Sequence, residues 1–119
     1  MNNKVFCYGT LKDGGRWHHL IEKAEFIGDG KLSGFEMYEM EGGIMPMLKP
    51  CPGGVVHGEV YEVDKPTLDK LRVLERQYKE INANVFIDGV QVSCYVYIYS
   101  ELLSHYKWIR VPSGIFKVK

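Results

Sequence analysis

Hydrophobic and polar residues alternate in several short stretches of the chain, as they do in β-strands. The first stretch is residues 4–11, and another covers residues 55–64. Residues 25–40 also contain strand-like pieces, whereas residues 42–54, which include three prolines, predict a loop-rich connection. Isolated glycines within strands indicate bulges or sharp corners. We therefore expect such irregularities at Gly28, Gly30 and Gly34.

Two other segments carry apolar residues at helical spacing. Residues 16–26 predict a short helix, and residues 64–80 predict a longer one. Asp64 is a suitable N-cap for the longer helix, and Pro66 is tolerated in its first turn, where an N–H would be unpaired anyway. Four residues form the apolar stripe that should face the sheet: Leu68, Leu71, Leu74 and Tyr78.

Residues 83–100 predict a β-hairpin, because two apolar runs flank Asp88-Gly89, a strong two-residue turn signal. The second strand of this hairpin is apolar on both faces and carries Tyr95, Tyr97 and Tyr99 on one of them. Such a strand is expected to be central in its sheet and covered on both sides. Strands interrupted by glycines around one clear helix predict a mainly antiparallel α+β domain with a small curved or barrel-like sheet.

Length and composition narrow the class of protein. A chain of 119 residues predicts one domain spanning 1–119, and 45% hydrophobic with 25% charged residues is the balance of a folded soluble protein. Equal numbers of basic and acidic side chains, fifteen of each, disfavour a nucleic-acid binder, including a small barrel that binds RNA. No apolar run approaches the roughly 20 residues of a membrane span. The first residues lack the apolar core of a signal peptide, so we expect a cytoplasmic protein with no membrane or nucleic-acid partner.

The cysteines and histidines show no spacing typical of a metal site. Cys7, Cys51 and Cys94 are odd in number and widely spaced, which predicts reduced thiols and neither a disulfide framework nor a zinc site. His18 and His19 are adjacent, and adjacent residues in a helix point about 100° apart. We expect no metal and no cofactor.

Glu75 is the candidate for chemistry within the longer predicted helix. It lies seven residues after Leu68 and four after Leu71, so it projects from within the apolar stripe. Burial of a lone carboxylate raises its pKa, which is how a glutamate becomes a usable general acid or base near neutrality. The alternative is a glutamate at the edge of the stripe that reaches water or pairs with Arg72 or Lys79.

The segment Tyr8-Gly9-Thr10-Leu11 has two interpretations. A glycine after a strand often only permits a turn. A loop of this kind can also hold an anion through its backbone N–H groups, and a glycine then lets the ligand approach closely. The pattern alone leaves both interpretations open.

Three stretches of the chain, taken together, resemble the γ-glutamylcyclotransferase-like superfamily. They are "VFCYGTLKDGGRWHHL", "GEVYEVD" leading into "LDKLRVLERQY", and "VSCYVYIYS", in that order over almost the whole chain. The similarity is greatest to the small members of the superfamily, the γ-glutamylamine cyclotransferase and AIG2-like group. Its most specific part is the combination of the first motif, [VF]-x-Y-G-[ST]-L, with a glutamate that ends an L-x-x-[LF]-E motif.

The resemblance implies a fold, a reaction and a set of site residues. The fold is a small mixed, mainly antiparallel β-barrel with flanking helices. In the reaction, the α-amino group of a γ-glutamyl unit attacks its own γ-carbonyl, closes 5-oxoproline and expels an amine or amino acid. Glu75 matches the catalytic glutamate of the family. The substrate-binding residues that the resemblance implies are Tyr8, Gly9, Thr10, Leu11 and Tyr78.

Three positions depart from the family pattern. Arg76 stands where a small residue is common, and Glu80 stands where an arginine is expected. Trp17-His18 occupies the place of an Asn-His pair. We expect these changes to affect the rim of the pocket and the choice of substrate. Tyr78, Tyr97 and Tyr99 are candidates for pocket lining, although packing within the barrel is the favoured role for any one of them.

The sequence therefore predicts a cyclotransferase that releases 5-oxoproline from a γ-glutamyl amine or γ-glutamyl amino acid. Glu75 would shuttle the proton, and the loop amides would hold the substrate carboxylate or the developing oxyanion. The expected partner is this small molecule, and the expected assembly is a monomer or weak homodimer. The alternative is a non-catalytic module on the same fold that binds a small metabolite or a partner protein.

Overall fold

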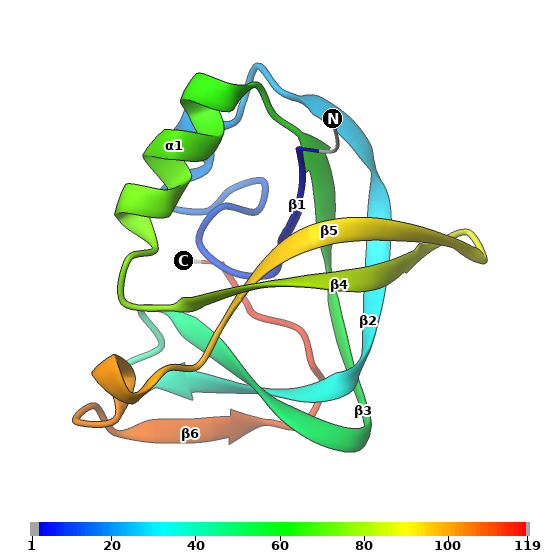
Figure 1. Cartoon of the computed structure of the whole chain (residues 1–119). Coiled ribbons are helices and arrows are strands. Elements are labelled where there is room, and N and C mark those ends of the chain that lie inside the picture. Colours follow the sequence, from blue (N-terminus) through cyan, green and yellow to red (C-terminus); the bar gives the residue numbers. More distant parts are fainter. Residues whose placement is uncertain (1–2, 119) are drawn as a thin grey trace.

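A sheet that closes on itself into a barrel forms the body of the protein (Figure 1). The computed structural model describes residues 3–118. The strands in this range are β1 (Lys4–Cys7), β2 (Glu25–Met40), β3 (Pro46–Glu62), β4 (Lys79–Ile87), β5 (Val90–Ile98) and β6 (Trp108–Val111).

The order of the strands explains how the barrel closes. Neighbouring strands follow the order β3-β1-β5-β4-β2-β6, and β2 pairs again with β3. Five strands therefore form the closed barrel, and β6 extends the sheet beyond β2. The β1–β5 pair is parallel and the other pairs are antiparallel. This confirms the prediction of a small, mixed, mainly antiparallel β-barrel.

The helix α1 (Lys65–Leu74) lies against the outer side of the barrel (Figure 1). Its beginning is as predicted, because the Asp64 side chain accepts a hydrogen bond from the Thr67 N–H at 2.8 Å. The prediction that the helix continues to residue 80 was wrong. Lys79 and Glu80 instead open β4, where they pair with Ile98 and Tyr97 of β5. Pairing with a distant strand overrides the local helical pattern at this point.

The helix predicted over residues 16–26 was also wrong. Only a single 3₁₀ turn, η1 (His18–Leu20), forms there, and β2 begins at Glu25. A second 3₁₀ turn, η2 (Glu101–Leu103), follows β5. The apolar residues of the first segment still serve a packing role, because Ile21 is buried and Leu20 packs against the same cluster.

The connection predicted over residues 42–54 is largely strand. β3 begins at Pro46 and runs through this segment, pairing with β2 on both sides of a corner. Prolines are tolerated in strands where their missing N–H is not needed by the ladder. Irregular pairing between Phe26 and Gly28 and between Ser33 and Phe35 confirms bulges at two of the three predicted glycines. Gly30 is regular, and it is a glycine because a Cβ there would lie 2.5 Å from Val85 Cγ1.

The hairpin of β4 and β5 forms as predicted. Asp88 and Gly89 both have positive φ, of 49° and 78°, as a type I′ turn requires. Cys94 and Val96 of β5 face the barrel interior, whereas Tyr97 faces a second apolar cluster that includes Leu68 and Leu71 of α1. β5 is thus central and covered on both faces, and α1 is fastened to the barrel beside it.

Candidate active site

A small chamber lies where the end of α1 meets the loop that follows β1. Its volume is about 30 Å³, enough for one group of the size of a water molecule. The structure brings all six predicted site residues together in its wall. The lining residues are Phe6, Cys7, Tyr8, Gly9, Thr10, Leu11, Pro46, Glu75, Tyr78 and Tyr97.

Glu75 is held by its backbone at the point where α1 stops. It is the C-cap of the helix, and its N–H donates to the carbonyl of Leu71 at 2.8 Å. Its own carbonyl accepts from the N–H of Tyr78 at 2.9 Å, which closes the turn toward β4. The side chain continues the apolar stripe of the helix, as the sequence predicted, and enters the wall of the chamber.

The carboxylate of Glu75 is largely buried and has no ion pair or hydrogen bond with any residue of the described range 3–118. Burial raises the pKa of Glu75 to about 7. The alternative in which Arg72 neutralises Glu75 was wrong. Arg72 instead holds Glu80, with distances of 2.8 Å from Nε to Oε1 and 3.1 Å from Nη2 to Oε2.

Two tyrosines that line the chamber with Glu75 donate their hydroxyl protons to backbone carbonyls. The Tyr78 hydroxyl donates to the carbonyl of Pro46 at 2.7 Å, and the Tyr8 hydroxyl donates to the carbonyl of Tyr97. A phenol has one proton to donate, so these two oxygens can only accept further hydrogen bonds. Burial, together with the charge of Glu75, raises the pKa of both tyrosines and keeps them protonated. The chamber therefore offers a carboxylate and two neutral acceptors to a cationic donor.

The loop Gly9 to Leu11, which also lines the chamber, has unused donors. The carbonyls of Gly9, Thr10 and Leu11 accept from Lys12 N–H (3.0 Å), Trp17 N–H (2.9 Å) and His18 Nδ1 (2.9 Å). The N–H groups of the same three residues, by contrast, donate to no residue in the described part of the chain. Consecutive free N–H groups of this kind form a site for an anionic oxygen.

This loop, residues 8–12, is braced by the far end of the chain. Lys12 Nζ donates to the carbonyl of Phe116 at 3.0 Å, and the Phe116 ring packs into the barrel interior. Gly9 in the same loop is required by a neighbour, because a Cβ there would lie 2.4 Å from Cγ of Pro46. The expected need for close approach of a ligand was therefore not the whole reason for this glycine; the proline at the start of β3 also demands it.

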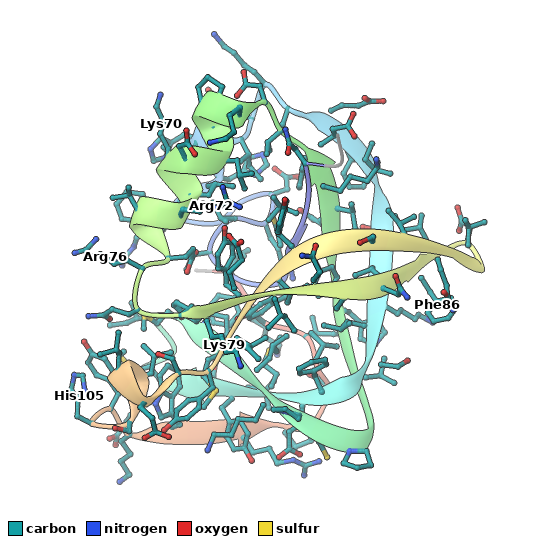
Figure 2. The ribbon with its side chains drawn as sticks, viewed as in Figure 1. Lys70, Arg72, Arg76, Lys79, Phe86 and His105 are labelled. Atoms are coloured by element: carbon teal, nitrogen blue, oxygen red, sulfur yellow. The ribbon has the colours of Figure 1, made fainter. Side chains whose placement is uncertain are left out.

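A wider cleft of about 200 Å³ adjoins the chamber, and the two share Thr10, Glu75 and Tyr78. Seven other residues line the cleft: Arg16, Trp17, Ile44, Met45, Leu74, Arg76 and Gln77. Two of the three departures from the family pattern, Trp17 and Arg76, thus lie at the mouth of the site. Arg76 stands at the carboxyl end of α1 in Figure 2.

The third departure, Glu80, acts on the chamber through another residue. Its Oε1 accepts from the hydroxyl of Tyr97 at 2.9 Å, and Tyr97 lines the chamber as predicted. Tyr99 lines neither the chamber nor the cleft; Lys49 Nζ lies over its ring, 4.5 Å from the centroid. In Figure 2, Arg72 extends from α1 toward the strands that carry Tyr97 and Glu80.

Several lining residues had no signal in the sequence. Pro46, Ile44 and Met45 come from the segment that was predicted to be a loop, and only the closed barrel brings them beside Glu75.

The three cysteines are free thiols. Across residues 3–118, no three His, Cys, Asp or Glu side chains are grouped so that they could hold a metal ion. None of the helices there has the length and apolarity needed to span a membrane.

The closed mixed barrel with its flanking helix is the fold of solved AIG2-like and γ-glutamyl cyclotransferase structures. The family model described as γ-glutamyl cyclotransferase, AIG2-like, matches residues 5–117, and the chain belongs to this family. Membership supports a cyclotransferase-like enzyme that acts on small γ-glutamyl substrates.

Individual relatives agree with this assignment. A protein of Methanocaldococcus jannaschii, named provisionally as a γ-glutamylcyclotransferase, is 33% identical over 95% of this chain and 94% of its own length. The γ-glutamylcyclotransferase family protein YtfP of Escherichia coli is 30% identical over 90% of this chain and 91% of its own length. The crystal structure of a mouse AIG2-like protein superposes with a TM-score of 0.74 and 26% identity, covering 99% of this chain and 97% of the mouse chain.

Proposed function

We propose that this protein releases 5-oxoproline from a γ-glutamyl amine or γ-glutamyl amino acid, with Glu75 as the proton shuttle. The observation that carries this proposal is the unpaired, buried carboxylate of Glu75, whose pKa of about 7 suits a group that must take and return protons near neutrality. A protein that only bound an anionic ligand would gain nothing from this carboxylate, because burial without a partner is costly.

The two walls of the chamber suit the two ends of the reacting unit. Glu75 and the hydroxyl oxygens of Tyr8 and Tyr78 would accept from the α-ammonium group of the substrate. The free N–H groups of the loop, Gly9 to Leu11, would donate to its α-carboxylate or to the oxyanion that develops on the γ-carbonyl oxygen. Held in this way, the α-nitrogen lies close to the γ-carbon, so attack becomes an intramolecular step.

The proton count of the reaction explains why one carboxylate is sufficient. Glu75 takes a proton from the α-ammonium group, and the freed amine attacks the γ-carbonyl carbon. The bond from that carbon to the leaving nitrogen breaks as protonated Glu75 returns its proton to the leaving nitrogen. A second proton follows from the ring nitrogen to the departing amine, which leaves as an ammonium ion. The products are 5-oxoproline and the amine, with no net proton released and no nucleophile required from the protein.

Mass spectrometry of 5-oxoproline tests the proposal. Wild type, Glu75→Gln and Glu80→Gln would each be incubated with γ-glutamyl amino acids, γ-glutamyl amines and ε-(γ-glutamyl)-lysine. We expect product from wild type and Glu80→Gln but not from the isosteric Glu75→Gln, with circular dichroism verifying that all three are folded. Equal product from Glu75→Gln would overturn the role of the shuttle. No product from any folded protein would favour a binding module instead.

A further inference from the structure

The size of the chamber determines where the leaving group must lie. At about 30 Å³ the chamber holds little more than the reacting atoms, whereas the adjoining cleft offers about 200 Å³. The leaving nitrogen must be within reach of Glu75 to receive its proton, and Glu75 belongs to the walls of both spaces. The remainder of the leaving group therefore extends from Glu75 into the cleft.

The charges of the cleft are unbalanced. Arg16 and Arg76 both line it, and Glu75 is the only acidic residue in its wall. Arg16 makes no ion pair with any residue of the described range. Arg76 donates from Nη1 to the carbonyl of Val73 at 3.0 Å, which anchors its guanidinium and leaves its other donors unused. The next acid along the chain after Arg76, Glu80, is already held by Arg72.

The remaining wall of the cleft combines polar residues, Thr10, Gln77 and Tyr78, with an apolar part. Trp17, Ile44, Met45 and Leu74 form the apolar part, and Trp17 and Ile44 leave 37% and 49% of their surface exposed. Apolar surface beside two guanidinium groups suits a ligand with an apolar part and a carboxylate, because a guanidinium pairs with a carboxylate through two parallel N–H donors. An ammonium-bearing ligand would be repelled there. Trp17 and Arg76 are departures from the family pattern, so this wall is a property of this chain.

Resting on the proposed function, we propose that the cleft selects a leaving group that carries a carboxylate, with Arg16 and Arg76 as the residues that determine this specificity. The preferred substrates are then γ-glutamyl α-amino acids with an apolar side chain. γ-Glutamyl amines, and above all γ-glutamyl polyamines with a second ammonium group, are disfavoured.

Matched substrates isolate the carboxylate. γ-Glutamyl-leucine and γ-glutamyl-3-methylbutylamine differ only by that group, and γ-glutamyl-putrescine replaces it by a cation. We expect wild type to prefer γ-glutamyl-leucine by about tenfold or more in kcat/KM over the neutral amine, which corresponds to roughly one charged contact. The double variant Arg16→Gln/Arg76→Gln should reduce this ratio to about 1, and Arg16→Glu/Arg76→Glu should make γ-glutamyl-putrescine the better substrate.

Lys70→Gln is the control for the loss of a positive charge, because Lys70 is exposed on α1 and does not line the cleft (Figure 2). It should leave the preference ratio at the wild-type value. Wild-type rates that agree within about twofold for the leucine and amine substrates, or a ratio that the arginine variants do not change, would overturn this inference alone. Absence of 5-oxoproline from all three substrates would overturn the proposed function, and this inference with it.

Discussion

Glu75 and Glu80 lie five residues apart, at the end of α1 and the start of β4, and their carboxylates have opposite surroundings. Glu75 is largely buried and has no ion pair or hydrogen bond from its carboxylate within residues 3–118, and burial raises its pKa to about 7. Glu80 is partly exposed and accepts from Arg72 and Tyr97, and these hydrogen bonds lower its pKa. One turn of chain between them is enough to produce a group that exchanges protons near neutrality and a group that stays charged.

In this pair of glutamates, the partner of each carboxylate, more than its place in the sequence, determines its protonation chemistry. Arg72 pairs with Glu80, which the start of β4 places opposite Tyr97. The pKa of Glu75 is raised by burial alone, with no contribution from Arg72. The structural pair and the candidate catalytic group are therefore separate.

A larger groove lies elsewhere on the barrel. Its volume is about 480 Å³, and Phe86 at the hairpin tip in Figure 2 lines it. Its charged lining residues are of both signs: Lys12 and Lys31 with Asp29, Glu59 and Asp88. Volume alone does not identify the reactive site; the small chamber with an unpaired acid is the better candidate.

The largest expected effect is on turnover. Glu75→Gln removes the group that takes and returns the proton, so we expect 5-oxoproline release to fall by about 1,000-fold or more. Glu80→Gln leaves the chamber acid in place and should cost less than about tenfold. Steady-state rates measured on the best substrate compare the two variants, and similar losses in both would show that the two glutamates share one role.

The pH dependence of kcat/KM should show which glutamate titrates. The shuttle acts first as a base, so Glu75 must be ionised, and its pKa is about 7. We expect kcat/KM to fall roughly tenfold for each pH unit below 7, as expected for a single ionisation. Glu80→Gln should show the same profile. A wild-type rate that is constant from pH 5 to pH 8 would contradict the assignment.

Glu75→Gln should raise the stability of the folded protein although it lowers activity. The folded-state pKa of Glu75 is raised from 4.5 to about 7, so ionising it on going to higher pH destabilises the folded protein across this window. Glu75→Gln removes that cost and should raise the free energy of unfolding at pH 8 by about 2–3 kcal/mol. The gain should be absent at pH 4. Urea denaturation at both pH values measures it, and a gain of equal size at both would exclude the titration as its cause.

The smallest effect is expected for the exposed pair. Glu80→Gln removes a bidentate contact with Arg72, but partly exposed ion pairs contribute little, so the loss should be about 1 kcal/mol or less. Because the folded-state pKa of Glu80 is lowered, this contribution is present above the unfolded-state pKa and disappears as the pH falls. Denaturation in high salt should shrink it further, and a loss above about 3 kcal/mol would contradict a surface role.

Much of this site could be predicted from local sequence, because its key residues carry local signals. Glu75 interrupts an apolar stripe, Asp64 caps the helix, and Asp88-Gly89 makes the hairpin turn. The place where α1 ends could not be predicted, since it depends on pairing of β4 with β5. Residues 16–26 follow a helical spacing yet are held by the loop, where the Trp17 N–H donates to Thr10.

The contribution of β3 was the least predictable part. Three prolines argue against a strand, yet Pro46 packs on Gly9, accepts from Tyr78 and lines the chamber. Pro46 pairs with Glu39 of β2, and the bent pairing of β2 with β3 determines its position. The same holds for Ile44 and Met45 in the cleft. Specificity residues of this kind are visible only once the barrel has closed.

The bond between Lys12 and Phe116 has a consequence for how the protein folds. The loop proposed to receive the substrate is braced by a residue that lies 104 positions later in the chain than Lys12. Contacts between such distant residues form late in folding, because the loop-closure entropy must be overcome first. A chain that stops before Phe116 would carry every residue of the chamber and still lack the hydrogen bond that braces this loop.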